Sequence, residues 1–263
     1  MRLSAIGDEI GTTLEEQIES LKLAHMNKIE IRKINDKYLW EFTEEELKEF
    51  KKILDKENIE VLTIDSPVGK KPIPYSRKVE LFDIYLNICK IFDSKILRIF
   101  SNLGKEINED SIKIDLHRVC EKAEKEGIKL IMENERATFA ESPVDCLKIF
   151  GNEKNIEIVY DLENAFFEGH DIFESYEKAK EKITYIHLRD FDIKGNKYEY
   201  LGEGDFQIER FMNILKNDGF NGVISIETHL PMNNSGKSKR ELFMKSMDNF
   251  YNIVKRLNIT ITE

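Results

Sequence analysis

Residues 129–135 read KLIMENE, a short apolar run that ends in acidic side chains, and similar runs occur in IEIVYDLEN (156–164), ITYIHLRD (183–190) and VISIETH (223–229). Apolar runs of about four to eight residues are typical of buried strands. A charged helical stretch precedes KLIMENE and stops at Gly127, a residue type that commonly ends helices. The repeating unit is therefore a helix, a tight turn and a strand with its polar residues last.

This unit extends along the whole chain, with amphipathic stretches between the apolar runs. Strand–helix alternation repeated eight times predicts the α/β class and a single (β/α)8 TIM barrel that covers residues 1–263 as one domain. The predicted strands are Leu3–Ile6, Ile29–Ile31, Val61–Ile64, Ile96–Phe100, Lys129–Met132, Ile156–Tyr160, Ile183–Leu188 and Val223–Ile226.

The loops after the predicted strands are longer than the turns before them, notably at residues 65–76, 189–206 and 228–237. In β/α barrels the strand-to-helix loops form the C-terminal mouth, where active sites are built. We therefore expect the active site at that end. The segment LGEGDF (201–206) is predicted to shape a loop over the mouth, with Asp205 as the N-cap of the next helix.

The composition argues against several classes of partner. Hydrophobic residues make up 41 % of the chain, and the net charge of -10 argues against a protein that grips nucleic-acid phosphates. No apolar run approaches the roughly 18–20 residues of a membrane span, so we expect no membrane partner. Cys89, Cys120 and Cys146 lack metal-ligand spacing and are predicted to be reduced packing residues, consistent with a cytoplasmic protein.

Four potential metal ligands come at the ends of four successive predicted strands: Glu133, Asp161, His187 and Glu227. A barrel with these strands in order brings all four side chains to one rim. Three carboxylates and one imidazole form a mostly oxygen site, which suits Mn²⁺, Mg²⁺ or Co²⁺ and also admits Zn²⁺. Four protein ligands leave coordination positions for substrate oxygens or water.

Several cationic residues are expected near this rim. The candidate substrate contacts are Arg32, Lys70, Arg98, Arg189 and His229. Side chains two residues apart point to the same side of a strand, which aims Arg189 and His229 at the mouth together with the ligands that precede them. For Arg32 and Arg98, a salt bridge to a neighbouring strand-end carboxylate is an equal alternative.

These motifs resemble those of the xylose isomerase-like barrel superfamily of sugar-phosphate isomerases and epimerases. The resemblance covers nearly the whole chain, through GDEIG, IEIR, SPVGK, LRIFS, IMENE, VYDLEN, IHLRD, LGEGDF and SIETH. It implies that Glu133, Asp161, His187 and Glu227 bind one divalent ion, most often Mn²⁺. It also implies that the two glutamates are catalytic and exchange protons with a substrate carbon, through a metal-stabilised enediolate.

The chain departs from some members of this superfamily. Ketose 3-epimerases carry a histidine where this chain has Asn164, which we keep as a candidate substrate contact, and an arginine where it has Ile193 and Lys194. These differences argue against a simple ketohexose 3-epimerase. The DNA-repair relative endonuclease IV uses additional histidines, which the third and fourth strand ends of this chain lack.

The sequence thus predicts a metal-dependent isomerase or epimerase that abstracts a proton next to the carbonyl of a small ketose or related polyol ketone. A lyase on the same site, of the inosose dehydratase or C-glycoside-cleaving type, is the main alternative, and a non-catalytic binding barrel is a remote one. The expected partner is a small-molecule carbohydrate, and whether it is phosphorylated stays open. Relatives often form homo-oligomers, but nothing in this sequence fixes a subunit number.

Overall fold

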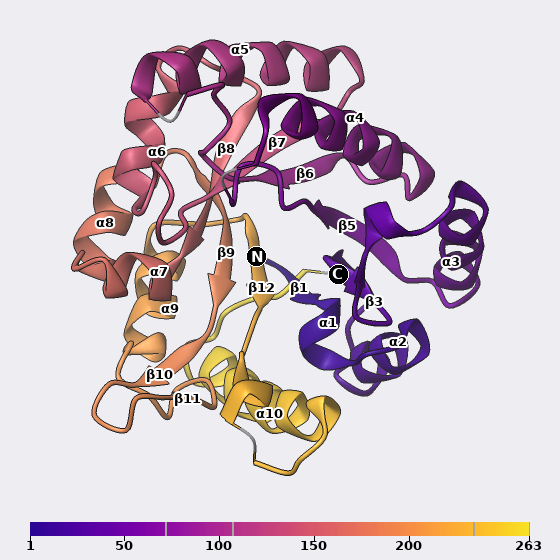
Figure 1. The fold of residues 1–263 in the computed structure, drawn as a ribbon. Helices are drawn as coiled ribbons and strands as arrows, with labels where there is room; N and C mark the ends of the chain where they lie inside the picture. The colour runs from indigo at the N-terminus through magenta and orange to yellow at the C-terminus, as the bar shows by residue number, and fades with distance from the viewer. Residues whose placement is uncertain (72, 107, 234, 263) are drawn as a thin grey trace.

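The computed structural model describes residues 1–71, 73–106, 108–233 and 235–262. In this part of the chain, eight parallel strands close into a barrel in the order β1-β12-β9-β8-β7-β6-β5-β2, and helices surround it (Figure 1). The barrel strands are β1 (Arg2–Ile6), β2 (Lys28–Ile31), β5 (Glu60–Asp65), β6 (Ile96–Ile99), β7 (Lys129–Glu133), β8 (Ile156–Asp161), β9 (Ile183–Leu188) and β12 (Val223–Ile226). The predicted (β/α)8 barrel is confirmed, and every predicted strand end lies within one residue of the observed one.

The outer layer consists of helices that return the chain from each strand to the next. They are α1 (Gly7–Ile10), α2 (Leu14–Leu23), α3 (Glu44–Lys56), α4 (Tyr75–Ile91), α5 (Glu109–Lys125), α6 (Pro143–Phe150), α7 (Leu162–Phe167), α8 (Ile172–Ala179), α9 (Ile208–Asn217) and α10 (Lys239–Arg256), with short 3-10 turns η1 (Leu39–Glu41) and η2 (Leu230–Asn233). Several begin with a capping box, such as Thr43 with Glu46 and Ser238 with Glu241. Hence the boundaries are set locally, by the residues that satisfy the first free N–H groups.

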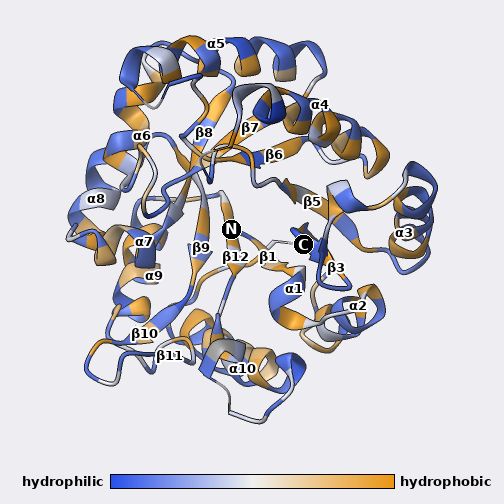
Figure 2. Ribbon diagram, viewed as in Figure 1, coloured by the Kyte–Doolittle hydropathy of each residue, from blue (hydrophilic) through white to orange (hydrophobic). Residues whose placement is uncertain are grey.

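The core has two parts. A large cluster lies between the strands and the helices, and a small one fills the barrel interior with Leu62, Ile131, Val159, Tyr185 and Val223. Figure 2 shows the strands mostly in hydrophobic colours, whereas the helices carry both kinds of residue. The hydroxyl of Tyr185 lies 3.3 Å from that of Thr63, so a hydrogen-bonded layer already begins inside the barrel. Cys89, Cys120 and Cys146 are buried and free, as the sequence predicted.

No described helix is long and apolar enough to cross a lipid bilayer. The two ends of the described chain lie side by side (Figure 1), because the backbone N–H of Thr262 donates to the carbonyl of Met1 at 2.9 Å.

Two small hairpins at the mouth were not predicted. One is β3 (Lys33–Ile34) with β4 (Lys37–Tyr38), and the other is β10 (Asp190–Asp192) with β11 (Lys197–Glu199). Both lie in strand-to-helix connections, after β2 and β9. Their strands are only two or three residues long, too short for a periodic signal.

The loop LGEGDF is organised by Asp190 rather than by Asp205. The buried Asp190 carboxylate accepts backbone N–H bonds from Gly202, Gly204 and Phe206 at 2.9–3.1 Å. A Cβ at Gly204 would lie 2.3 Å from the same carboxylate, so only glycine permits this approach. The prediction that Asp205 caps the next helix is wrong, because α9 starts at Ile208 after the left-handed Gln207, and Asp205 instead accepts the N–H of Ile193.

We predict that Asp190→Ala destabilises the protein by about 3 kcal/mol, because several buried N–H donors lose their charged acceptor. Urea unfolding followed by circular dichroism measures this change. Asp192→Ala, in the adjacent exposed turn, serves as control and should cost less than about 1 kcal/mol, since it loses one solvent-accessible bond to Gly195. Equal effects of the two substitutions would contradict the role given to Asp190.

A candidate metal site at the barrel mouth

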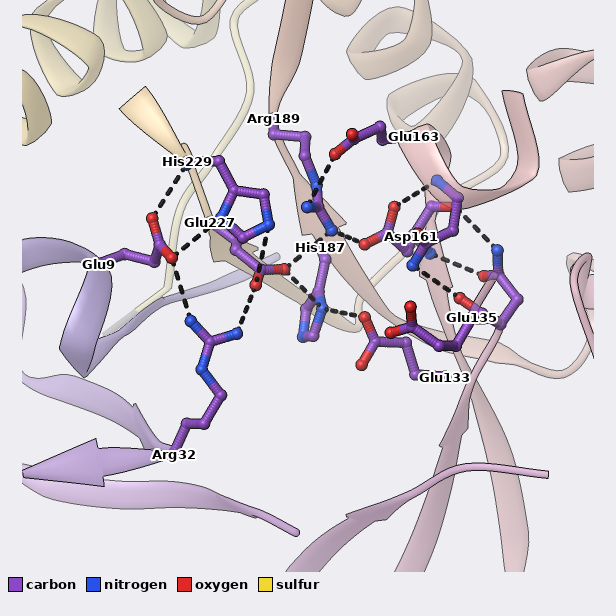
Figure 3. A network of polar contacts seen from close by, with 12 residues as sticks. Glu9, Arg32, Glu133, Glu135, Asp161, Glu163, His187, Arg189, Glu227 and His229 are labelled. Carbon is purple, nitrogen blue, oxygen red and sulfur yellow. Dashed lines mark hydrogen bonds and ion pairs between the residues drawn. The ribbon is translucent and has the colours of Figure 1, made fainter. Parts of the chain in front are cut away.

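The fold brings the four predicted ligands together at the C-terminal ends of β7, β8, β9 and β12 (Figure 3). Each side chain offers one ligand atom, and these atoms all lie within 4.8 Å of one another. All four residues are at most 2 % exposed. Ligands on opposite sides of one ion lie at most about 4.2 Å apart, so a small inward movement would let the four side chains hold a single cation.

The charge around the cluster fits a divalent cation. Seven buried acidic side chains lie at or next to it, together with only three arginines and two imidazoles: Glu9, Glu30, Asp65, Glu133, Asp161, Glu163 and Glu227, with Arg32, Arg98, Arg189, His187 and His229. Buried carboxylates need compensating charge. The carboxylate oxygens and the imidazole nitrogen are a donor set that Mn²⁺, Mg²⁺, Co²⁺ and Zn²⁺ accept.

Glu133 is held from inside the barrel. Arg98, on β6, forms an ion pair with its carboxylate, and Nδ1 of His187 lies 3.1 Å from Oε1. Burial by itself raises the pKa of Glu133, but the charges of Arg98 and His187 outweigh it and hold the pKa well below its usual range. Glu133 is therefore a carboxylate at neutral pH.

Glu227 is held between two arginines. Nη1 of Arg32 lies 2.8 Å from one carboxylate oxygen, and Nη2 of Arg189 lies 3.0 Å from the other (Figure 3). Burial raises the pKa of Glu227, but the charges of Arg189, His229 and His187 outweigh this and bring the pKa well below its ordinary value. Both glutamates of the cluster are thus ionised at neutral pH.

His187 occupies the centre of the cluster. Its Nδ1 faces Glu133 and Glu227 at 3.1 and 3.2 Å, and its Nε2 lies 3.0 Å from Glu30 on β2. Burial lowers the pKa of the imidazole, but the neighbouring carboxylates of Glu30 and Glu133 raise it well above its ordinary value. In the metal-free protein His187 therefore carries a proton at neutral pH.

Asp161 is held in place by hydrogen bonds to its side chain and to its backbone. Its Oδ1 caps α7 by accepting the N–H of Asn164 at 2.9 Å, and the side chain of Asn134 bonds both its N–H and its carbonyl. The side-chain amide of Asn164 donates to the carbonyl of Asn134 at 3.0 Å. Hence the side chain of Asn164, predicted as a substrate contact, bonds the protein instead and links the start of α7 to Asn134, which follows β7.

Arg189 lies over the cluster. It pairs with Asp161, with Glu227, and at 2.8 Å with Glu163, whose other oxygen accepts the hydroxyl of Tyr198 at 3.0 Å. Sequence reasoning missed Glu163 and Tyr198. The two-residue pleat applied to Asp161 points to Glu163, although Glu163 lies in α7 and not in the strand. Tyr198 comes from the unpredicted β10–β11 hairpin.

A second acidic group adjoins the first on the β1 side. Glu9, from α1, accepts both the backbone N–H and Nδ1 of His229 at 3.0 Å, and Arg32 bonds Glu9 and Asp8. His229 has a positive φ of 50°, a conformation that costs energy outside glycine and is concentrated at functional sites. Glu9, like Glu163, was not predicted.

Arg32 and Arg98 form salt bridges to carboxylates, which was the predicted alternative to substrate contact. Lys70 has the most exposed side chain of the predicted cationic contacts. Its Nζ lies 2.7 Å from Glu135 and over the ring of Phe100. The structure therefore brings His229 and Arg189 to the ligand cluster and leaves Lys70 at its rim.

A cavity of about 750 Å³ lies at the opposite, N-terminal end of the barrel. Charged residues that line it neutralise each other in ion pairs, Lys129 with Glu157 and Lys180 with Asp218. None of the four candidate ligands lines it. The chemistry and the cavity thus lie at different ends, and the mouth is the end with clustered reactive groups.

Fold and site together define the class of this protein: a closed parallel barrel with a cluster of one histidine and three carboxylates, the four candidate ligands, at its C-terminal mouth. The chain belongs to the xylose isomerase-like TIM barrel family, whose model matches residues 22–250. This membership agrees with the resemblance found in the motifs.

Two curated proteins are similar to this chain at low sequence identity. An uncharacterised protein of Methanocaldococcus jannaschii is 27 % identical over 153 residues, or 56 % of this chain and 52 % of that protein, so the chain matches about half of its length. An inosose dehydratase of Clostridium perfringens is 21 % identical over 243 residues, or 84 % of this chain and 77 % of that protein.

Solved structures share the fold. The IOLI protein, solved with a zinc atom, has a TM-score of 0.79 at 19 % identity, over 99 % of this chain and 100 % of that one. Other similar structures include epimerases and a probable dehydratase. The neighbours are therefore enzymes of two reaction classes.

We predict that divalent-metal binding strengthens as pH rises, by about tenfold per pH unit while pH stays below the raised pKa of His187, because an ion must displace one proton from that ring. Titration with Mn²⁺ at pH 6, 7 and 8 measures the slope. The variant His117→Gln, at an exposed ion pair with Glu153, should leave the slope unchanged. A pH-independent affinity would show that His187 is not a ligand.

Proposed function

We propose that this protein is a divalent-metal-dependent isomerase or epimerase of a small ketose or related polyol ketone. The observation that carries the proposal is the placement of two ionised glutamates on either side of the cluster. In the barrel order β12-β9-β8-β7, Glu227 and Glu133 stand at the outer positions, with His187 and Asp161 between them. A substrate held over the cluster lies between two proton-transfer groups.

The charges of these glutamates suit proton transfer in both directions. Each is a carboxylate at neutral pH, held by an arginine and by His187. An ionised carboxylate accepts the proton next to the substrate carbonyl, and its protonated form returns a proton to the next carbon or to the other face. An ion bound by the four residues, Mn²⁺ by preference, would offset the negative charge that develops on the substrate oxygen.

The remaining polar groups divide by their partners. Arg98 and Arg32 are proposed to hold Glu133 and Glu227, with which they form ion pairs. Arg189, His229 and Lys70 also pair with protein carboxylates, and they are the proposed substrate contacts. Arg189 and His229 lie against Glu227, and the half-exposed Lys70 lies beside Glu135 at the rim.

A dehydratase acting through the same first step is the second candidate. The relative named inosose dehydratase, which aligns with 84 % of this chain, favours it. Loss of a hydroxyl group after proton abstraction requires an acid beside the leaving oxygen. Glu163 with Tyr198 supplies such a group close to Asp161.

We predict that the Mn²⁺-loaded protein, incubated in D₂O with a panel of ketoses and inososes, incorporates deuterium next to the carbonyl of one class. Mass spectrometry of recovered substrate and product distinguishes exchange or epimerisation from loss of water. Glu227→Gln should lower the rate by about 10²–10⁴-fold, the usual contribution of an acid–base group.

Glu157→Gln is the matched control, because Glu157 lies on β8 at the other end of the barrel, paired with Lys129. Its exchange rate should match that of the wild type. Exchange that persists unchanged in Glu227→Gln would contradict the assignment of this glutamate.

A further inference from the structure

The buried carboxylate of Glu30 has no place in the proton-transfer chemistry. Glu30 lies on β2 and is 0 % exposed, yet β2 supplies none of the candidate ligands. An uncompensated buried carboxylate is costly, and a leucine would pack the same space without that cost. The contacts of Glu30 explain its presence.

Glu30 bonds the side of the His187 ring that faces away from the ligand cluster. Its Oε1 lies 3.0 Å from Nε2, whereas Nδ1, on the other side of the ring, faces Glu133 and Glu227. A carboxylate accepts hydrogen bonds, so Glu30 keeps a hydrogen on Nε2, and the hydrogen that an incoming metal ion would displace is the one on Nδ1. The ring packs edge-on against Tyr185 at 5.9 Å, which restricts its rotation.

The backbone of β2 is adjusted at this residue. The pairing of β2 with β5 shifts its register between Ile29 and Glu30. Such irregularities re-aim side chains next to functional sites. We attribute the register shift to the need to direct the Glu30 carboxylate at His187.

A parallel arrangement supports Glu133. Arg98 on β6 bonds Glu133, and its Nε lies 3.2 Å from Asp65 on β5. Three neighbouring strands without candidate ligands, β2, β5 and β6, thus provide Glu30, Asp65 and Arg98. Glu30 contacts His187, and Arg98, paired with Asp65, contacts Glu133. We infer that Glu30 is a positioning residue, which fixes the orientation and tautomer of His187 so that its Nδ1 binds the metal ion.

This inference rests on the metal role proposed above for His187, and metal binding tests it without any substrate. Co²⁺ affinity is measured by competition with a chelating dye, for the wild type, Glu30→Gln, Glu30→Met and Glu30→Asp. Loss of the acceptor in Glu30→Met should weaken binding by about 10–100-fold, as removal of an outer partner of a ligating histidine does. Glu30→Gln keeps an acceptor oxygen at the same reach and should restore most of the affinity.

The control is Gln17→Met, which removes another fully buried polar side chain whose bonds go to the carbonyls of Gly11 and Lys33, away from the cluster. Its Co²⁺ affinity should equal that of the wild type. Nitrogen-15 spectra of the imidazole rings in the Zn²⁺-loaded protein provide a second readout. The chain has only five histidines, so few ring signals need to be assigned. The His187 ring should carry its hydrogen on Nε2 in the wild type and in Glu30→Gln.

Wild-type affinity and an unchanged His187 spectrum in Glu30→Met would overturn the inference. If Glu30→Met does not fold, Glu30→Asp decides in its place, because it retains the charge but withdraws the acceptor by about one C–C bond, roughly 1.5 Å. Affinity in Glu30→Asp as high as in the wild type would then refute the positioning role. A wild-type protein that binds neither Co²⁺ nor Zn²⁺ would refute the proposed function itself, and this inference with it.

Discussion

Carboxylates buried at the centre of the barrel stay charged only because cations lie among them. Desolvation alone would raise the pKa of Glu133 and Glu227 and neutralise them. The charge of Arg98 reverses that effect at Glu133, those of Arg189 and His229 reverse it at Glu227, and His187 contributes to both. The mouth of this barrel is therefore an electrostatic arrangement in which the charge of Glu133 and that of Glu227 depend on neighbouring cations.

This constraint divides the barrel into two functional halves. Strands β7, β8, β9 and β12 carry the candidate ligands at their ends, and β2, β5 and β6 carry Glu30, Asp65 and Arg98, which hold His187 and Glu133. The loops add a third contribution, because the Asp190 carboxylate fixes the LGEGDF segment and Tyr198 reaches Glu163. A metal ion would add positive charge where several carboxylates converge, and His187 would then give up its proton.

The barrel was predictable because its strands are short apolar runs that end in polar residues, and because stop signals such as Gly127 end the helices just before the strands. The cluster of the four candidate ligands was predictable because parallel strands in order bring their C-terminal ends to one rim. The partners of those ligands were not. Whether Arg98 meets a substrate or Glu133 depends on strand register and side-chain direction, which no local pattern records. In the sequence Glu30 looks like an ordinary strand residue, and only the closed barrel shows that its carboxylate contacts His187.

The small loops defeated prediction for a related reason. Asp205 has the residue type of a helix cap, yet Gln207 adopts a left-handed conformation and delays α9. Asp190 is then the acceptor for the loop, because the glycines allow its carboxylate close to the backbone. Tertiary contact, rather than local preference, decides such segments.

The central claim is that Glu133, Asp161, His187 and Glu227 together hold one divalent ion. Crystals soaked in MnCl₂, with diffraction recorded on both sides of the manganese absorption edge, test it most directly. The account predicts one anomalous peak per chain, about 2.0–2.3 Å from an atom of each of the four side chains. No peak among these residues, or a peak bound elsewhere in the barrel, would contradict it.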